Sequence, residues 1–217
     1  MCSVKIAVIG SGDVGQALAK GLVEVGHSVM IGTRDTSKKE LKWTKKHDKS
    51  KLSVGSYAEA ADFGEMAILA VAWHAAENVL GIIRPELSGK IVIDVTNPLQ
   101  FSDDEGPQLA VGHNMSAGEM VQQTLTDAHV VKTLNTINFK NMVQPQFKDG
   151  TPTMFMCGNN ESAKAHVKEL LTELGWQDIQ DIGDIEKSRL LEPLCLLWIE
   201  YGALNDTWDH AISILKK

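Results

Sequence analysis

Residues 4–15 read Val4-Lys5-Ile6-Ala7-Val8-Ile9-Gly10-Ser11-Gly12-Asp13-Val14-Gly15, an apolar run that leads directly into a glycine motif. Residues 4–9 predict a buried strand and residues 14–25 a helix, which places the glycines in the turn between them. In such a turn Gly10 permits a tight bend, Gly12 lets the backbone approach a pyrophosphate, and Gly15 lets the helix pack closely on the strand. The free N–H groups at the helix start then bind the anion. We therefore predict a dinucleotide site at Gly10, Ser11, Gly12, Asp13, Val14 and Gly15.

Apolar runs alternate with segments of helical period along the rest of the chain. The runs predict strands at residues 28–31, 52–54, 66–70, 91–95, 129–133 and 153–157, and the segments between them predict helices near 75–83, 117–125 and 161–174. Strands that are apolar throughout and separated by helices indicate a parallel sheet covered on both faces. We therefore expect the α/β class: a doubly wound, mainly parallel Rossmann sheet with a small C-terminal helical appendage.

Two regions depart from this alternation. Residues 96–116 contain two prolines and Gly106 and are expected to form a loop. The stretch from about residue 186 is rich in Leu and Trp and predicts helix, which Glu192-Pro193 should start or kink. We place a domain boundary near residue 183, between a Rossmann domain (1–183) and a C-terminal helical part (184–217). Three aromatic side chains of that part could form a slab for a flat ring, but their helical spacing favours core or interface positions: Trp198, Tyr201 and Trp208.

Composition limits the class of protein. The chain has 217 residues, 43% of them hydrophobic, and a net charge of −7, which argues against nucleic acid or an anionic membrane as a partner. No apolar run approaches the roughly 20 residues that span a bilayer, and the N-terminus has no separate charged and apolar signal regions. The three cysteines are far apart and form no metal or redox spacing. We therefore expect a reduced, cytoplasmic protein that binds no metal.

The end of the second strand indicates which dinucleotide binds. Many NAD-binding folds place Asp or Glu at that tip to hold the ribose hydroxyls. This chain has Gly32-Thr33-Arg34 there, followed by Lys38, and a hydroxyl with two cations suits a 2′-phosphate. Asp35 lies about 20 residues after Gly15 but beyond the strand tip, where neighbouring cations should outweigh it. The sequence favours NADP(H) over NAD(H), with Thr33, Arg34 and Lys38 at the 2′-phosphate.

Two further strand ends should flank the nicotinamide ribose, because ligands in such sheets bind outside the carboxyl ends of the strands. These are Val71-Ala72-Trp73-His74 after the fourth strand and Asn97-Pro98 after the fifth. His74 is open to three roles: a proton donor, a cap for the following helix or a ribose contact. The sequence contains no catalytic dyad, and we name no catalytic residue.

Seven segments together resemble the F420-dependent NADP oxidoreductase family, in the same order and over nearly the whole chain. They are GSGDVG (10–15), GTR (32–34) with Lys38, AVAWHA (70–75), KIVIDVTNP (90–98), SAGEMV (116–121), VVKTLNT (130–136) and DIEKSRLLEPL (184–194). The resemblance implies that Ser11, Gly12, Asp13 and Val14 contact the pyrophosphate. It also implies that residues 134–138 line the pocket of a second cofactor, with Asn135 and Ile137 in contact with it.

The resemblance further implies an activity. In that family NADPH and the deazaflavin F420 stack face to face and hydride passes directly between the rings, so the protein supplies orientation and excludes water. Characterised F420 enzymes have a histidine where this chain has Asn135 and a proline where it has Asn138. The acceptor therefore remains open between coenzyme F420, a flavin, a ferric chelate and a small carbonyl compound. We expect a homodimer, in which residues 184–217 complete the acceptor pocket or the dimer interface.

Two other functions remain as alternatives. One is NADPH-dependent reduction of a small imine or carbonyl compound, as in the pyrroline-carboxylate reductases, although about 35 residues after the last strand are few for the helical domain of those enzymes. The other is a non-catalytic module that binds NADP(H) to sense its level. The first predicts turnover with an imine, whereas the second predicts binding without turnover.

Overall fold

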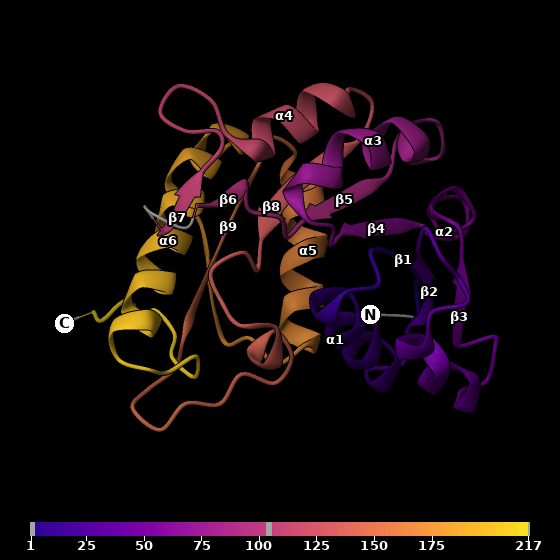
Figure 1. The fold of residues 1–217 in the computed structure, drawn as a ribbon, viewed down its shortest axis with the longest axis horizontal. Helices are drawn as coiled ribbons and strands as arrows, with labels where there is room; N and C mark the ends of the chain where they lie inside the picture. The colour runs from indigo at the N-terminus through magenta and orange to yellow at the C-terminus, as the bar shows by residue number, and fades with distance from the viewer. Residues whose placement is uncertain (1–2, 103–105, 217) are drawn as a thin grey trace.

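An eight-stranded sheet crosses the molecule in the computed structural model, which describes residues 3–102 and 106–216 (Figure 1). The spatial order of its strands is β10-β9-β8-β5-β4-β1-β2-β3. All neighbours pair in parallel except β8 and β9, which confirms the mainly parallel Rossmann sheet. The strands are β1 (Lys5–Ile9), β2 (Ser28–Gly32), β3 (Leu52–Gly55), β4 (Met66–Leu69), β5 (Ile91–Asp94), β8 (His129–Thr133), β9 (Thr153–Gly158) and β10 (Asp178–Asp181).

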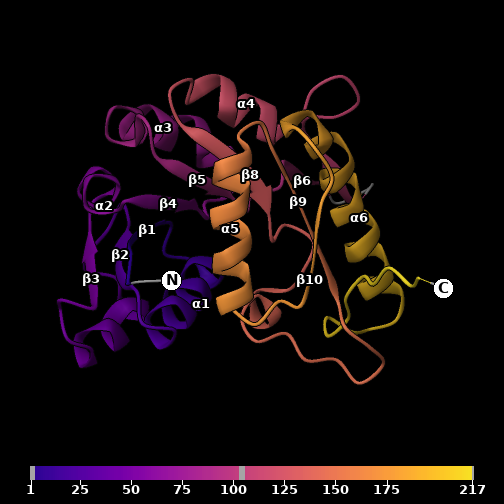
Figure 2. The same cartoon turned by 180° about the vertical axis from the view of Figure 1, so that it is seen from behind.

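Helices cover both faces of the sheet, so the fold is doubly wound as predicted. On one face, Ile6 and Val8 of β1 pack in the same apolar core as Leu18 of α1 and Val167 of α5. The alternate residues of β1 point to a second core that includes side chains of α2, α3 and α4. Figure 2 shows α5 in front of the strands. The helices are α1 (Asp13–Glu24), α2 (Tyr57–Phe63), α3 (Trp73–Ile83), α4 (Ala117–Thr124), α5 (Glu161–Glu173) and α6 (Ser188–Leu204), with the short helices η1 (Lys39–Lys46), η2 (Arg84–Leu87), η3 (Phe139–Asn141) and η4 (Ile185–Lys187).

The loop prediction for residues 96–116 is wrong in part. The structure has a two-stranded antiparallel hairpin there, formed by β6 (Leu99–Ser102) and β7 (Gly106–Leu109). Most of its side chains are partly or fully exposed, so the sequence shows none of the apolar alternation that marks a half-buried strand. Pro107 is tolerated because the hairpin is not part of the main sheet and need not donate to a central ladder. The hairpin lies beside α6 (Figure 1).

Helix α6 is the main element of the C-terminal part and lies on the β9–β10 side of the sheet, away from β3 (Figures 1 and 2). The helix starts at Ser188, so the expectation that Glu192-Pro193 starts it is wrong. Pro193 lies inside the helix and is exposed; its missing N–H leaves the carbonyl group of Arg189 without the usual helical donor. Trp208 lies beyond the helix rather than on it. In the described part of the chain, no helix is long and apolar enough to cross a membrane.

Candidate dinucleotide site

The glycine turn lies between β1 and α1, and each glycine has a distinct steric reason. Gly10 has φ of +131°, and a Cβ there would lie 2.1 Å from the carbonyl oxygen of Ala70. A Cβ on Gly15 would lie 2.1 Å from the carbonyl oxygen of Gly10, so α1 packs directly on the turn. A Cβ on Gly12 would meet nothing within 4 Å. The turn therefore has a tight bend at Gly10, a close contact at Gly15 and an open backbone at Gly12, as a pyrophosphate cradle requires.

The turn lies at the point where the strand order of the sheet reverses. β1 has β2 on one side and β4 on the other, and the chain crosses to the second half of the sheet after β3. Hydrogen bonds join the tips of these strands: Gly10 donates its N–H to Gly32 at 2.9 Å, and Ala70 donates to Ile9 at 2.8 Å. Ligands of open α/β sheets bind in the crevice at such a point. The structure therefore places the predicted residues of three strand ends along one edge.

Three residues predicted for the phosphates meet at the tip of β2. The hydroxyls of Ser11 and Thr33 lie 2.8 Å apart, and Lys38 donates from Nζ to Ser11 Oγ at 3.1 Å. Ser11 and Thr33 are buried, whereas Arg34 is exposed at the same tip. Two hydroxyls and an ammonium group next to an uncovered backbone form a donor set that suits phosphate oxygens.

Asp35 is the acidic residue that could have bound a ribose hydroxyl, but its carboxylate is hydrogen-bonded within its own turn. Its Oδ1 accepts hydrogen bonds from the N–H of Ser37 at 2.9 Å and from the hydroxyl of Ser37 at 2.6 Å. These bonds, with a smaller contribution from the charges of Lys38 and Arg34, hold the pKa of Asp35 below its usual range. The carboxylate is thus committed to the loop, which fits a site for a 2′-phosphate better than one for a 2′-hydroxyl.

The β4 end leads into α3. Ala72 is the N-cap and makes no side-chain cap, so the first N–H groups of α3 have no side-chain partner from that position. Val71 and Trp73 are half-buried, and His74 is exposed in the first turn. His74 does not occupy the N-cap position, and the structure leaves its other two roles as predictions.

The ends of β5 and β8 are joined by a pair of asparagines. Asn97 donates from its side-chain amide to the Asn135 carbonyl at 2.8 Å, and Asn135 donates to Asn97 Oδ1 at 2.9 Å. Asn135 also donates to the Leu191 carbonyl of α6 at 2.9 Å. Leu134, between β8 and this pair, has φ of +59°, a conformation that bulky residues rarely adopt. Two residues predicted at different strand ends therefore form one unit, which also contacts α6.

Two other predicted residues lie close to the asparagine pair in sequence. Pro98 is buried, and its carbonyl group accepts the N–H of Ala110 at 2.7 Å, which anchors the hairpin to the end of β5. Ile137 is buried and belongs to the core that includes α1 and α5. Neither side chain has a polar atom, so each residue would contact a ligand only through apolar packing or through its backbone.

A buried charged cluster that was not predicted from the sequence lies next to these strand ends. Lys132 Nζ lies 3.0 Å from Asp94 Oδ2 and 3.0 Å from Glu192 Oε1, and all three side chains are at most 1% exposed. Burial alone would lower the pKa of Lys132, but the two carboxylates outweigh burial and raise it above its ordinary value. The available signal was a lysine inside the apolar run VVKTL, because a buried lysine requires charged partners.

Glu192 also connects α6 to α4. Its carboxylate accepts the N–H of Ala117 at 2.9 Å and that of Gly118 at 3.0 Å, at the start of α4. A Cβ on Gly118 would lie 2.3 Å from Ser188 Oγ, which explains a glycine at this contact. The C-terminal helix is thus held to the sheet by buried polar groups as well as by apolar packing.

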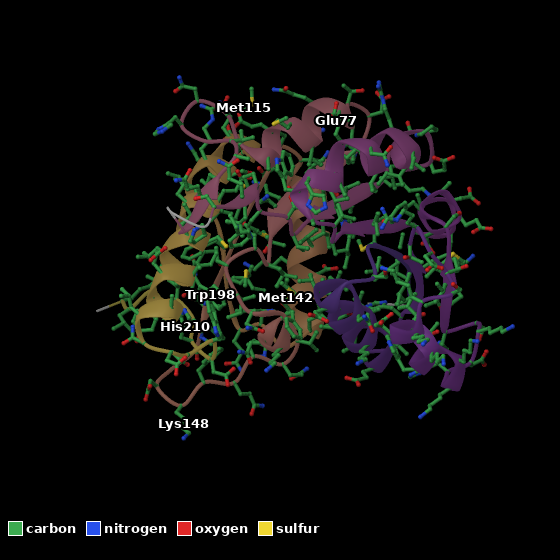
Figure 3. All side chains as sticks on the ribbon, viewed as in Figure 1. Glu77, Met115, Met142, Lys148, Trp198 and His210 are labelled. Atoms are coloured by element: carbon green, nitrogen blue, oxygen red, sulfur yellow. The ribbon has the colours of Figure 1, made fainter. Side chains whose placement is uncertain are left out.

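Trp198 and Tyr201 of the C-terminal part border a separate cleft of about 860 Å³, which shares no lining residue with the predicted dinucleotide site. Trp198 is buried, stacks on His210 with ring centroids 4.6 Å apart and donates to the His210 carbonyl at 3.0 Å (Figure 3). Tyr201 and Trp208 are more than two-fifths exposed. Trp198 is therefore a core residue, as its spacing favoured.

Comparison with known proteins identifies relatives of the whole chain. Residues 5–98 match the family model described as NADP oxidoreductase, coenzyme F420-dependent. The F420-dependent NADP reductase of Methanothermobacter marburgensis is 37% identical and aligns over 97% of this chain and 98% of its own length. A solved structure from Arthrobacter sp. FB24, described as a candidate F420-dependent NADP reductase, is 36% identical, with a TM-score of 0.93 and coverage of 99% of this chain and 100% of that one. Rat metalloreductase STEAP3 is 29% identical over 89% of this chain, which spans 37% of that protein.

Proposed function

The chain belongs to the family of coenzyme F420-dependent NADP oxidoreductases and is an NADP-dependent oxidoreductase, and on that premise we propose that it transfers hydride between NADP(H) and coenzyme F420. The proposed route is direct, from one ring to the other, at the ends of β4, β5 and β8. The relatives that carry this proposal are named for F420 and align with nearly the whole chain.

The residues present fit NADP(H). The backbone at Gly12 is open where a pyrophosphate must approach, and Ser11, Thr33 and Lys38 already converge at the tip of β2. We propose that Gly10, Ser11, Gly12, Asp13, Val14 and Gly15 hold the pyrophosphate and that Thr33, Arg34 and Lys38 hold the 2′-phosphate. Val71, Ala72, Trp73, His74, Asn97 and Pro98 border the nicotinamide and its ribose, and Asn135 and Ile137 line the adjoining acceptor pocket.

The groups at the site indicate what the cofactor and the protein would each contribute to the reaction. Bound NADPH supplies the hydride, and the chain needs no acid or base of its own to transfer it. The asparagine pair fixes the tips of β5 and β8 relative to α6, and the buried residues around it exclude water from that end of the crevice. Orientation and dehydration are the contributions that such a site makes to the rate.

An anaerobic acceptor assay tests the proposed function. Purified protein and NADPH are mixed with F420, and the visible absorbance of the acceptor is followed beside cuvettes that contain FMN, ferric citrate or a cyclic imine. We expect rapid bleaching of F420 and no comparable reaction in the other cuvettes. NADPH binding with no bleaching of F420 would refute the acceptor assignment and leave the dinucleotide site standing.

A ferric chelate is the second acceptor that an observation favours. The chain aligns along most of its length with a protein named as a metalloreductase. Fast reduction in the ferric citrate cuvette, with F420 unchanged, would establish this alternative. Turnover of the imine, or tight binding without turnover of any acceptor, would point instead to the imine reductase or the sensor.

We propose that a second copy of the chain covers one side of α6. Four apolar side chains on that helix are exposed at the spacing of a helix–helix contact: Leu190 (63%), Leu197 (63%), Tyr201 (52%) and Leu204 (83%). In this proposal residues 184–217 form the dimer interface beside a Rossmann domain of residues 1–183. Analytical ultracentrifugation should give a dimer for the parent protein and a monomer for Leu197→Asp. A monomeric parent at micromolar concentration would refute the proposal.

A cytoplasmic location also remains a proposal. Cys157 and Cys195 are free and buried, which suits a reducing compartment. Fractionation of the source cells with an antibody to the protein would test it, and recovery in an extracellular fraction would contradict it.

A further inference from the structure

The cluster of Asp94, Lys132 and Glu192 carries an excess of negative charge. Asp94 Oδ1 accepts from the N–H of Thr96 at 2.9 Å and from the hydroxyl of Thr96 at 2.7 Å, and its Oδ2 accepts from Lys132. Glu192 accepts from Lys132 and from two backbone N–H groups of α4. Every partner is a donor, so both carboxyl groups act only as acceptors, as carboxylates do. Two carboxylates and one ammonium group leave one net negative charge, which the start of α4 offsets in part.

This charge lies at the nicotinamide end of the crevice. Asp94 is the last residue of β5, and Asn97 follows it at the strand tip. A chain spans at most about 3.3–3.6 Å per residue, so Asn97 lies within roughly 10 Å of Asp94. Asn135 likewise follows Lys132 by three residues, with a bend at Leu134, and donates to the carbonyl of Leu191, the residue before Glu192. The cluster is therefore one layer below the asparagine pair and is shielded from water on all sides by burial.

The two redox forms of the cofactor differ in charge at this end alone. The oxidised nicotinamide ring is a cation, whereas the reduced ring is neutral, and the pyrophosphate and 2′-phosphate are the same in both forms. We propose that the Asp94–Lys132–Glu192 cluster determines which redox form binds more tightly, because its excess negative charge favours the oxidised ring. The cluster thereby biases bound NADPH toward giving its hydride, two electrons and one proton, to the acceptor. This inference rests on the proposed function, which places the nicotinamide at the tips of β5 and β8.

The size of the effect follows from Coulomb's law. A unit charge that acts over roughly 10 Å at an effective dielectric constant of about 20 changes a binding constant by roughly tenfold. The partial compensation by α4 reduces the effect of the parent cluster but not the change caused by removal of one carboxylate charge. The ratio of the two dissociation constants, for NADP⁺ and for NADPH, isolates this effect because any general loss of affinity cancels.

Glu192→Gln removes one charge and keeps the shape of the side chain. Titration calorimetry of NADP⁺ and NADPH should show the ratio of their dissociation constants, NADP⁺ over NADPH, rise by roughly tenfold relative to the parent. Asp94→Asn makes the same charge change from the sheet side and should shift the ratio in the same direction. It serves where Glu192→Gln does not fold.

Glu65→Gln is the control. Glu65 directly precedes β4 and accepts a hydrogen bond from the N–H of Lys5 at the start of β1, so the variant makes the same change of charge at the opposite edge of the sheet from the strand tips. The ratio of dissociation constants of Glu65→Gln should stay within twofold of that of the parent. An unchanged ratio in folded Glu192→Gln or Asp94→Asn, or an equal shift in Glu65→Gln, would overturn the inference while the proposed function stands. A parent protein that binds neither form would refute both.

Discussion

Gly12 separates the stability of the glycine turn from its binding role. A Cβ at Gly12 meets no atom within 4 Å, and its φ of −76° and ψ of −174° suit alanine. Gly12→Ala should therefore change the free energy of unfolding by less than about 1 kcal/mol, because the lower entropy of the unfolded chain is offset by the weaker preference of alanine for this N-cap position. The same methyl group projects where the backbone must approach the pyrophosphate. We expect NADPH affinity to fall by about 1.4–3 kcal/mol, roughly ten- to a hundredfold.

Gly10→Ala is the matched comparison and should have the opposite profile. Its Cβ would lie 2.1 Å from the Ala70 carbonyl oxygen, at a φ of +131° that alanine rarely adopts. Backbone strain and overpacking together should lower the free energy of unfolding by about 2–6 kcal/mol. Urea unfolding measures stability for both variants, and fluorescence titration with NADPH measures binding. A Gly12→Ala protein that binds NADPH as well as the parent would refute the assignment of the pyrophosphate to this turn.

Three further changes probe other parts of the account. Arg34→Ala should weaken NADPH binding by about 1.5–3 kcal/mol with little change for NADH, and an equal loss for both would remove Arg34 from the 2′-phosphate site. Lys132→Met should lower the free energy of unfolding by about 3–5 kcal/mol, because two buried carboxylates lose their cation; a loss below 1 kcal/mol in urea unfolding would show that the cluster does not need it. Burial raises the pKa of Cys157 to about 11 and that of Cys195 to about 12. Peptide mapping after iodoacetamide treatment at pH 8 should therefore find both cysteines unmodified in the folded protein and both modified in urea. Rapid labelling of the folded protein would contradict their burial.

The fold was predictable wherever one local pattern determined one element. In the strand–glycine–helix run from Val4 to Gly15, the local sequence alone determines the turn. The apolar runs at β4, β5 and β8 are buried on both sides. The hairpin of β6 and β7 and the edge strand β10 lack that pattern. Their side chains are partly exposed, so solvent imposes no alternation on the sequence.

The site was predictable in part for a related reason. Residues at strand tips follow directly from the order of the sheet, and the structure brings Ser11, Thr33 and Lys38 together at one tip. Asp94, Lys132 and Glu192 come from three elements separated by long stretches of sequence. No spacing rule connects them, and only the packing of α6 against the sheet brings the third charge to the other two.

The position of a deuterium label tests direct ring-to-ring transfer most sharply. Two samples of NADPH are prepared, with deuterium at the reactive carbon of the nicotinamide on one face or on the other. Each is mixed anaerobically with the protein and F420, and the reduced F420 is analysed by mass spectrometry. The account predicts that the label from one of the two faces is retained in reduced F420. Reduced F420 that carries the label from neither face, or no reduction of F420, would contradict it.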